Sequence, residues 1–330
     1  MVDTIWAWLG MTHPRYVLVD GGQDVTVLGA TVDVGDGVVC AVQRAGSAPT
    51  SGAEGMWWWH GGRAPDVATS RHHRLKIMQL VPGIPIRLHG MVFANVAVAF
   101  PPMEIVTLPR PGSGTFLCCG AVGAVPDDQT LRRLTDAIGA GLSARIGYRG
   151  AFSVDGIMSA NGFLPTDLNT RLTSAMEAAP AHLRVQIHVA NLIAREGCSL
   201  HDAEWLGELA ERVFSGDSVT IYGAANRATV ASEVPVRWDG RELVAADPGT
   251  AHGHISLEPS LRGWTLTARL QRDHLPSTPY AGTDAPRVFE FADRLLGTDF
   301  GLLAAPFGME RQLALPVPRR ETQNGSHKTV

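Results

Sequence analysis

The sequence predicts a mixed α+β fold, and three observations support this. Short runs of apolar, β-branched residues recur before residue 100 and again after residue 217, bounded by glycine and proline as strands are. Two segments, 127–146 and 181–214, carry apolar residues at helical spacing. Asn-Gly and Asp-Gly pairs between strand-like runs are hairpin signals. Hydrophobic residues make up 45% of the 330, enough to bury a core, which excludes a wholly disordered chain.

The first part of the chain is expected to consist of strands. They are predicted within 16–42, where glycines break the run, and at 56–59, 75–81 and 86–100. The segment 45–55 is small, polar and rich in glycine and serine, which is typical of a flexible loop.

Helices and hairpins follow. A helix is expected over 127–146, closed by Gly147, and the region 181–214 is expected to form two helices separated near Gly197. Strands after residue 217 include a hairpin at Asp239-Gly240, and the last helix is expected over 287–296. We therefore divide the chain into units at 1–70, 71–180 and 181–315, with a polar, disordered tail over 316–330.

Composition narrows the class of protein. The formal net charge is −4 and no basic run occurs, which argues against a nucleic-acid or membrane-surface partner. The four cysteines form no CxxC pair, and no signal peptide or long apolar span is seen, so a cytoplasmic location is expected. All but two of the 28 basic residues are arginines, and the lysines are Lys76 and Lys328.

Two carboxylates are expected to face each other across a hairpin formed by 151–158 and 163–169. If 160–162 is a three-residue loop, Asp155 lies opposite Asp167, and Asn169 shares the face of Asp167. Facing carboxylates repel, and a bound cation would reverse that effect. An all-oxygen ligand set suits Mg²⁺, and Arg171 could contact a phosphate. A solvated surface hairpin is the alternative, and a two-residue turn would break the alignment.

This segment resembles the signature of the ATP-grasp ligases, in which a strand acid precedes a hairpin that ends in Glu-x-Asn-x-Arg. The matching motif is Asp167-Leu-Asn169-Thr-Arg171. The run from Met78 to Phe93 resembles the adenine-pocket linker and the strand after it, and the run from Gln43 to Trp57 resembles the strand and glycine-rich lid over the triphosphate. The resemblance covers roughly 15–178 and is greatest to peptide ligases of the pheganomycin-ligase type.

The resemblance implies an ATP-grasp fold, with 1–70 as the lid subdomain, 71–180 as the catalytic subdomain and 181–315 as an extension of unknown role. It also implies ATP and Mg²⁺ as cofactors. The implied metal ligands are Asp155, Asp167 and Asn169, and the implied catalytic residues are Arg171 and Arg149, although Arg149 could instead pin the hairpin. The implied nucleotide contacts are Gln43, Ser47, Ser51, Gly52, Gly55, Met78, Gln79, Leu80 and Arg87.

The sequence also departs from the family pattern. Gln43-Arg44 stands where relatives carry a lysine that reaches the phosphates, and Lys76 is not an obvious replacement. Asp167 stands where glutamate is commoner, and Thr170 replaces the usual proline. The N-terminal domain of such ligases is expected to be absent, so a homodimer or a partner that supplies it is considered.

Two functions remain open at this point. The first is an ADP-forming carboxylate–amine ligase, for example a peptide ligase of secondary metabolism, acting on a small carboxylate and an amine through an acylphosphate. The second is an inactive relative that binds a nucleotide or a protein partner. The retained Asp155, Asp167, Asn169 and Arg171 favour the ligase, whereas the missing lid lysine favours the inactive relative.

Overall fold

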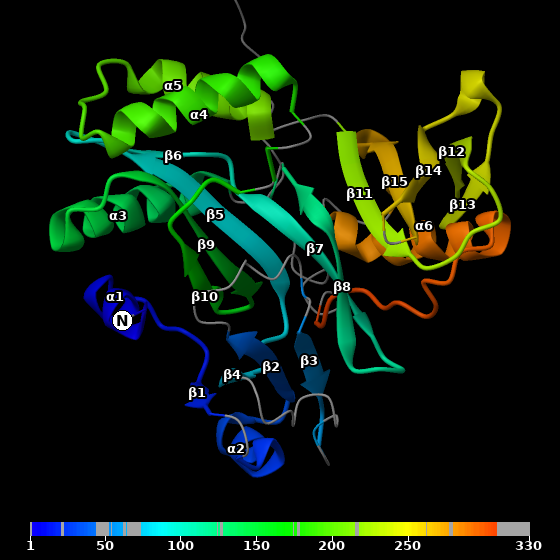
Figure 1. Cartoon of the computed structure of the whole chain (residues 1–330), viewed down its shortest axis with the longest axis horizontal. Coiled ribbons are helices and arrows are strands. Elements are labelled where there is room, and N and C mark those ends of the chain that lie inside the picture. Colours follow the sequence, from blue (N-terminus) through cyan, green and yellow to red (C-terminus); the bar gives the residue numbers. More distant parts are fainter. Residues whose placement is uncertain are drawn as a thin grey trace, which may run out of the picture.

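The structure is a computed structural model, and it describes residues 2–20, 23–43, 53, 55–61, 64, 74–123, 125, 128–173, 175–176, 179–214, 218–261, 263–276 and 280–308. It confirms the mixed α+β fold. A ten-stranded sheet and a five-stranded sheet lie side by side, with helices on the outside (Figure 1). The predicted tail at 316–330 lies outside the described residues, and the unit boundaries at 70 and 180 stay a prediction.

The large sheet has the order β1-β4-β2-β3-β8-β7-β5-β9-β10, with β6 paired to β5. Its strands are β1 (Tyr16–Val19), β2 (Val38–Gln43), β3 (Met56–Trp59), β4 (Arg74–Gln79), β5 (Ile84–Val92), β6 (Ala97–Ala99), β7 (Met103–Arg110), β8 (Thr115–Val122), β9 (Gly150–Ser159) and β10 (Gly162–Asn169). Every pair of neighbouring strands is antiparallel. The predicted strands at 56–59 and 75–81 are confirmed.

The N-terminal region contains two helices that the sequence analysis missed, α1 (Val2–Trp8) and α2 (Val25–Val32). The strands predicted within 16–42 are confirmed at the two ends of that range, as β1 and β2, whereas the helix α2 between them was not predicted. Asp24 caps α2, because its carboxylate accepts hydrogen bonds from the backbone N–H groups of Thr26 at 2.9 Å and Val27 at 3.2 Å. The cap outweighs the strand preference of the β-branched residues that follow it.

Helices cover the two faces of the large sheet. The buried face of α3 (Asp128–Ile146) packs against Ile84, Ile86 and Leu88, whereas α4 (Ala181–Arg195) and α5 (Ala203–Phe214) share a core with Met91. Because side chains alternate along a strand, these sets occupy opposite faces of β5. The predicted helices over 127–146 and 181–214 are confirmed.

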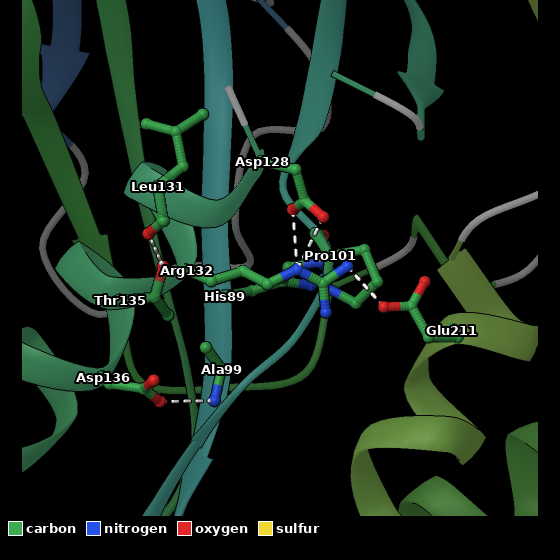
Figure 2. Close-up of polar contacts among 9 residues, drawn as sticks. All are labelled: His89, Ala99, Pro101, Asp128, Leu131, Arg132, Thr135, Asp136 and Glu211. Carbon is green, nitrogen blue, oxygen red and sulfur yellow. Dashed lines mark hydrogen bonds and ion pairs between the residues drawn. The ribbon is translucent and has the colours of Figure 1, made fainter. Parts of the chain in front are cut away.

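A polar cluster ties α5 to the layer of α3. Arg132 donates to both carboxylate oxygens of Asp128, at 2.7 and 2.8 Å, and forms an ion pair with Glu211 of α5 (Figure 2). The ring of His89, buried nearby, hydrogen-bonds the Pro101 carbonyl at 2.7 Å. Burial lowers the pKa of His89 to about 3, so this imidazole is neutral at pH 7.

The small sheet has the order β11-β15-β14-β12-β13 and packs against the last helix, α6 (Ala281–Leu296). Its strands are β11 (Ser218–Ala225), β12 (Ser232–Asp239), β13 (Glu242–Ala245), β14 (Gly253–Ser260) and β15 (Gly263–Gln271). The hairpin predicted at Asp239-Gly240 is confirmed by the pairing of Asp239 with Glu242. The predicted start of the last helix at residue 287 is wrong, because the helix begins six residues earlier.

The earlier start of α6 depends on a distant residue. Glu104 of β7 accepts hydrogen bonds from the backbone N–H groups of Ala281 at 2.7 Å and Gly282 at 2.8 Å. These are donors that the first turn of a helix leaves without an internal acceptor. Its carboxylate is buried, so the end of the small sheet's helix is fixed to the large sheet.

Candidate active site

The hairpin of β9 and β10 brings Asp155 and Asp167 opposite each other, as predicted, but by a different route. The turn has two residues, since Ser159 pairs with Gly162, and this corrects the expected three-residue loop. Such a turn alone would misalign the carboxylates. A bulge between Pro165 and Asp167 shifts the register by one residue and restores the pair.

Asp155 is held by Arg87 of β5. The Arg87 guanidinium donates from Nε to Oδ1 at 2.6 Å and from its terminal nitrogen to Oδ2 at 2.9 Å. Burial opposes the charge of Arg87, but the hydrogen bonds and the charge of Asp155 outweigh it and raise the pKa of Arg87. A cation at Asp155 would have to share the carboxylate with Arg87, using the remaining oxygen lone pairs.

Asp167 lies on the edge strand and is an exposed residue, so its carboxylate keeps part of its hydration. Nearby protein atoms remove some of that hydration and raise the pKa of Asp167, and the charge of Asp155 adds to this rise. Lys76 and a hydrogen bond from the Asn169 amide, at 3.2 Å, act in the opposite direction. A metal cation bound between Asp155, Asp167 and Asn169 would remove the repulsion between the two carboxylates. Carboxylate and amide oxygens are ligands that suit Mg²⁺.

Lys76 reaches this hairpin from β4, which lies far from β10 in the strand order. Its Nζ donates to the Thr166 carbonyl in the bulge at 2.7 Å and lies 4.6 Å from the centre of the Tyr16 ring. From the sequence, Lys76 is not an obvious replacement for the lid lysine. Its charge lies close enough to Asp167 to oppose the rise in the pKa of that carboxyl. The sheet curves so that the two regions meet, which no local pattern predicts.

The two predicted catalytic arginines lie in different surroundings. Arg149 donates to Ser143 Oγ at 2.8 Å and to the Tyr148 carbonyl at 2.6 Å, so it pins the end of α3 to the start of β9. Arg171 is exposed just beyond β10. The catalytic roles predicted for Arg149 and Arg171 stay predictions.

The predicted adenine linker uses part of its backbone within the fold. The N–H of Gln79 donates to the Arg15 carbonyl and that of Leu80 to the Gly37 carbonyl, both at 2.9 Å. Met78 lies between Tyr16 of β1 and Val39 of β2. A nucleobase at this linker would therefore have to meet other backbone groups or side chains.

The predicted lid is described only in part. Gly55 has a positive φ of 74°, and its carbonyl accepts the Val42 N–H at 2.9 Å. Gln43 ends β2 opposite Arg74. Ser47, Ser51 and Gly52 lie outside the described residues, so their predicted phosphate contacts stay a prediction.

Two residues near Arg87 and Asp155 escaped the sequence analysis. Tyr222 of β11 is 45% exposed, and its ring packs on Gly120 in the neighbourhood of Arg87. Ser153 lies two residues before Asp155, and its buried hydroxyl has no hydrogen-bond partner in the structure. Ser153 could have been found from the sequence, because a residue two positions before Asp155 on a strand lies on the same face of the sheet. No local pattern identifies Tyr222.

The part of the chain that the structure describes contains no cluster of three or more His, Cys, Asp or Glu side chains arranged to hold a metal. A metal ion held by Asp155, Asp167 and Asn169 would therefore need further ligands, such as phosphate oxygens or water. In the same described part, no helix combines the length and apolar character needed to span a bilayer.

Comparisons with known proteins give only distant similarities. No protein-family model and no curated protein matches the chain. Among solved structures, it is similar to N5-carboxyaminoimidazole ribonucleotide synthetase from Thermus thermophilus, at 14% identity and a TM-score of 0.46, over 89% of this chain and 71% of that one. It is also similar to phosphoribosylamine–glycine ligase from Thermotoga maritima, at 14% identity and a TM-score of 0.49, over 92% and 76% of the two chains. Because these values are low, function has to be inferred from the residues of this chain.

Proposed function

We propose that this chain is an ATP-dependent carboxylate–amine ligase with an ATP-grasp fold. The observation that supports this best is the direct pairing of Asp155 and Asp167 across a hairpin, with Arg87 and Lys76 beside them. Two carboxylates suit a divalent cation, and two cationic side chains suit the phosphates that the cation accompanies. Phosphoryl transfer needs this kind of charge neutralisation more than it needs a covalent nucleophile.

In the proposed reaction, a substrate carboxylate oxygen attacks the γ-phosphorus of ATP and ADP leaves. The amine nitrogen then attacks the acyl carbon, loses a proton, and phosphate departs. Asp155, Asp167 and Asn169 would hold Mg²⁺, which would neutralise phosphate charge when bound. Lys76, Arg87 and Arg171 would contact the anionic groups, with Lys76 taking the place of the missing lid lysine. Peptide bond formation in secondary metabolism, in the cytoplasm, is the specific form that we propose.

A second function is favoured by one specific observation. Arg87 already neutralises Asp155, and the N–H groups of Gln79 and Leu80 already have acceptors. A site whose groups are satisfied without a ligand has less to gain from ATP and Mg²⁺. The alternative is therefore an inactive relative that binds a nucleotide or a protein partner.

Calorimetric titration with ATP, with and without Mg²⁺, tests both functions. The ligase requires ATP binding that depends on Mg²⁺, followed by ADP release when pools of amino acids are added. ATP binding without ADP release from any acid and amine pool would favour the inactive relative. Absence of Mg²⁺-dependent binding would exclude the ligase.

The variant Asp167→Ala tests the metal assignment. It should abolish the Mg²⁺-dependent part of ATP binding, because a single carboxylate would remain at the hairpin. Asp36→Ala, at an exposed residue between α2 and β2, is the matched control and should bind as the wild type does. Thermal unfolding of both variants checks the fold. Unchanged binding in a folded Asp167→Ala protein would refute the assignment.

A further inference from the structure

The outer face of α4 carries an apolar stripe. Val185, Val189, Leu192 and Ile193 are 59%, 48%, 60% and 44% exposed, respectively. Their spacing of four, three and one residues puts them on one side of the helix. Single exposed apolar residues are ordinary, but a contiguous stripe on one helix marks an interaction surface.

The opposite side of α4 is apolar as well and is already used. Leu183, Ile187, Ala190 and Ala194 are buried in the core beneath the helix. The stripe is therefore a second apolar face of α4, separate from the one that packs on the sheet. Trp205, 44% exposed, is a further exposed apolar side chain at the start of α5, which follows the end of α4 after a short connection.

The two helices of this surface have opposite charge. α4 contains the half-buried Arg184, the exposed Arg195 and no acidic residue, whereas α5 contains three glutamates and one arginine. Glu211 is directed toward Arg132 of α3 (Figure 2). Glu204 and Glu208 remain exposed, one helical turn apart.

We propose that this surface, formed by α4 and α5, binds a second copy of the chain. In a two-fold dimer the same surface is used twice, so the basic α4 of one protomer can lie on the acidic α5 of its partner. The apolar stripe and Trp205 would be buried at the centre, and the charged residues would surround them. α4 and α5 lie together at the periphery of the molecule (Figure 1). The inner face of α4 contacts the start of β9, where Asn191 accepts the Ala151 N–H at 2.7 Å, so the outer stripe faces away from the hairpin that carries Asp155 and Asp167.

An anionic membrane is the other surface that a basic, apolar helix can bind. The exposed glutamates of α5 argue against it, because they would be repelled by anionic lipids that attract α4. A second copy uses both charges favourably, which is why we favour it.

Sedimentation velocity between about 1 and 100 µM tests the proposal. The wild type should show a dimer whose fraction rises with concentration. Val185→Asp should be monomeric throughout, because it introduces a charge into the apolar stripe that the dimer would bury. Val27→Asp is the matched control, since Val27 is 61% exposed on α2, away from this surface, and this variant should dimerise like the wild type.

A second variant guards against a folding artefact. Glu204→Arg combined with Glu208→Arg keeps good helix formers but gives both helices the same charge, and it should lower the dimer fraction at least about tenfold at low salt. A wild type that is monomeric at all concentrations would overturn the proposal, as would a Val185→Asp protein that still dimerises. Monomeric wild type that sediments with phosphatidylserine vesicles, while Val185→Asp does not, would assign the surface to membranes instead.

Discussion

At the scale of single residues, the ion pair between Arg87 and Asp155 decides how the candidate site behaves without a ligand. Arg87→Gln should lower the free energy of unfolding by about 1–3 kcal/mol, because it leaves a partly buried carboxylate beside Asp167 without its cation. Millimolar Mg²⁺ should restore part of this loss if the two aspartates bind it. Urea unfolding with and without Mg²⁺ measures both effects.

Arg74→Gln is the control for this variant. Its ion pair with Asp20 joins atoms 3.6 Å apart on side chains that are 59% and 87% exposed, so little stability should depend on it. A loss in Arg87→Gln that Mg²⁺ leaves unchanged would mean that the aspartates do not form a cation site.

At the scale of elements, the sequence predicted those helices and turns that are determined by interactions between residues close together in the chain. The hairpin at Asp239-Gly240 and the helices over 128–146 and 181–195 depend on turn chemistry and amphipathic spacing, and the sequence carries both. The start of α6 depends on Glu104, which lies on β7 and is 177 residues away from Ala281 in sequence. No window of the sequence contains both residues.

The candidate site shows the same division. The sequence predicted that Asp155 and Asp167 lie opposite each other. This pairing depends on a bulge at Thr166 that no sequence pattern predicted. The bulge carbonyl is held by Lys76 from a strand at the other side of the sheet. The alternation of side chains along the hairpin strands could therefore predict that Asp155 and Asp167 face each other. It could not predict that Arg87 and Lys76 lie beside them.

The cap on α6 gives a prediction about pH. Burial raises the pKa of Glu104 from 4.5 to about 7, so the folded protein keeps this proton at pH values where the unfolded chain has lost it. The contribution of Glu104 to the free energy of unfolding should therefore fall as pH rises from about 4.5 to 7, by roughly 3 kcal/mol at most.

Glu104→Gln removes the titrating group and keeps an acceptor for the helix. The free energy of unfolding is measured in urea at several pH values for both proteins. As pH rises from about 4.5 to 7, the wild type should lose stability relative to the variant. A difference that is the same at pH 4.5 and pH 7.5 would contradict the assignment.

At the scale of the whole molecule, the two sheets meet where Tyr222 of β11 packs on Gly120 of β8. Gly120 has a φ of +118°, and a β-carbon there would lie 2.9 Å from Cε1 of Tyr222 and 3.3 Å from the Thr220 carbonyl oxygen. This contact brings the small sheet near Arg87, so the C-terminal extension forms part of the surroundings of the candidate site.

Gly120→Ala should therefore destabilise the protein more than a backbone change alone would. Gly240→Ala is the matched control, because Gly240 also has a positive φ, 62°, but has nothing within 4 Å of an added β-carbon. We expect about 1 kcal/mol for Gly240→Ala and about 2–4 kcal/mol for Gly120→Ala in urea unfolding. Adding Tyr222→Ala should remove part of the extra cost, since it removes the ring that the new methyl group meets. Equal losses in the two glycine variants would mean that the sheets separate at this point without cost, and that Tyr222 does not hold the small sheet against the site.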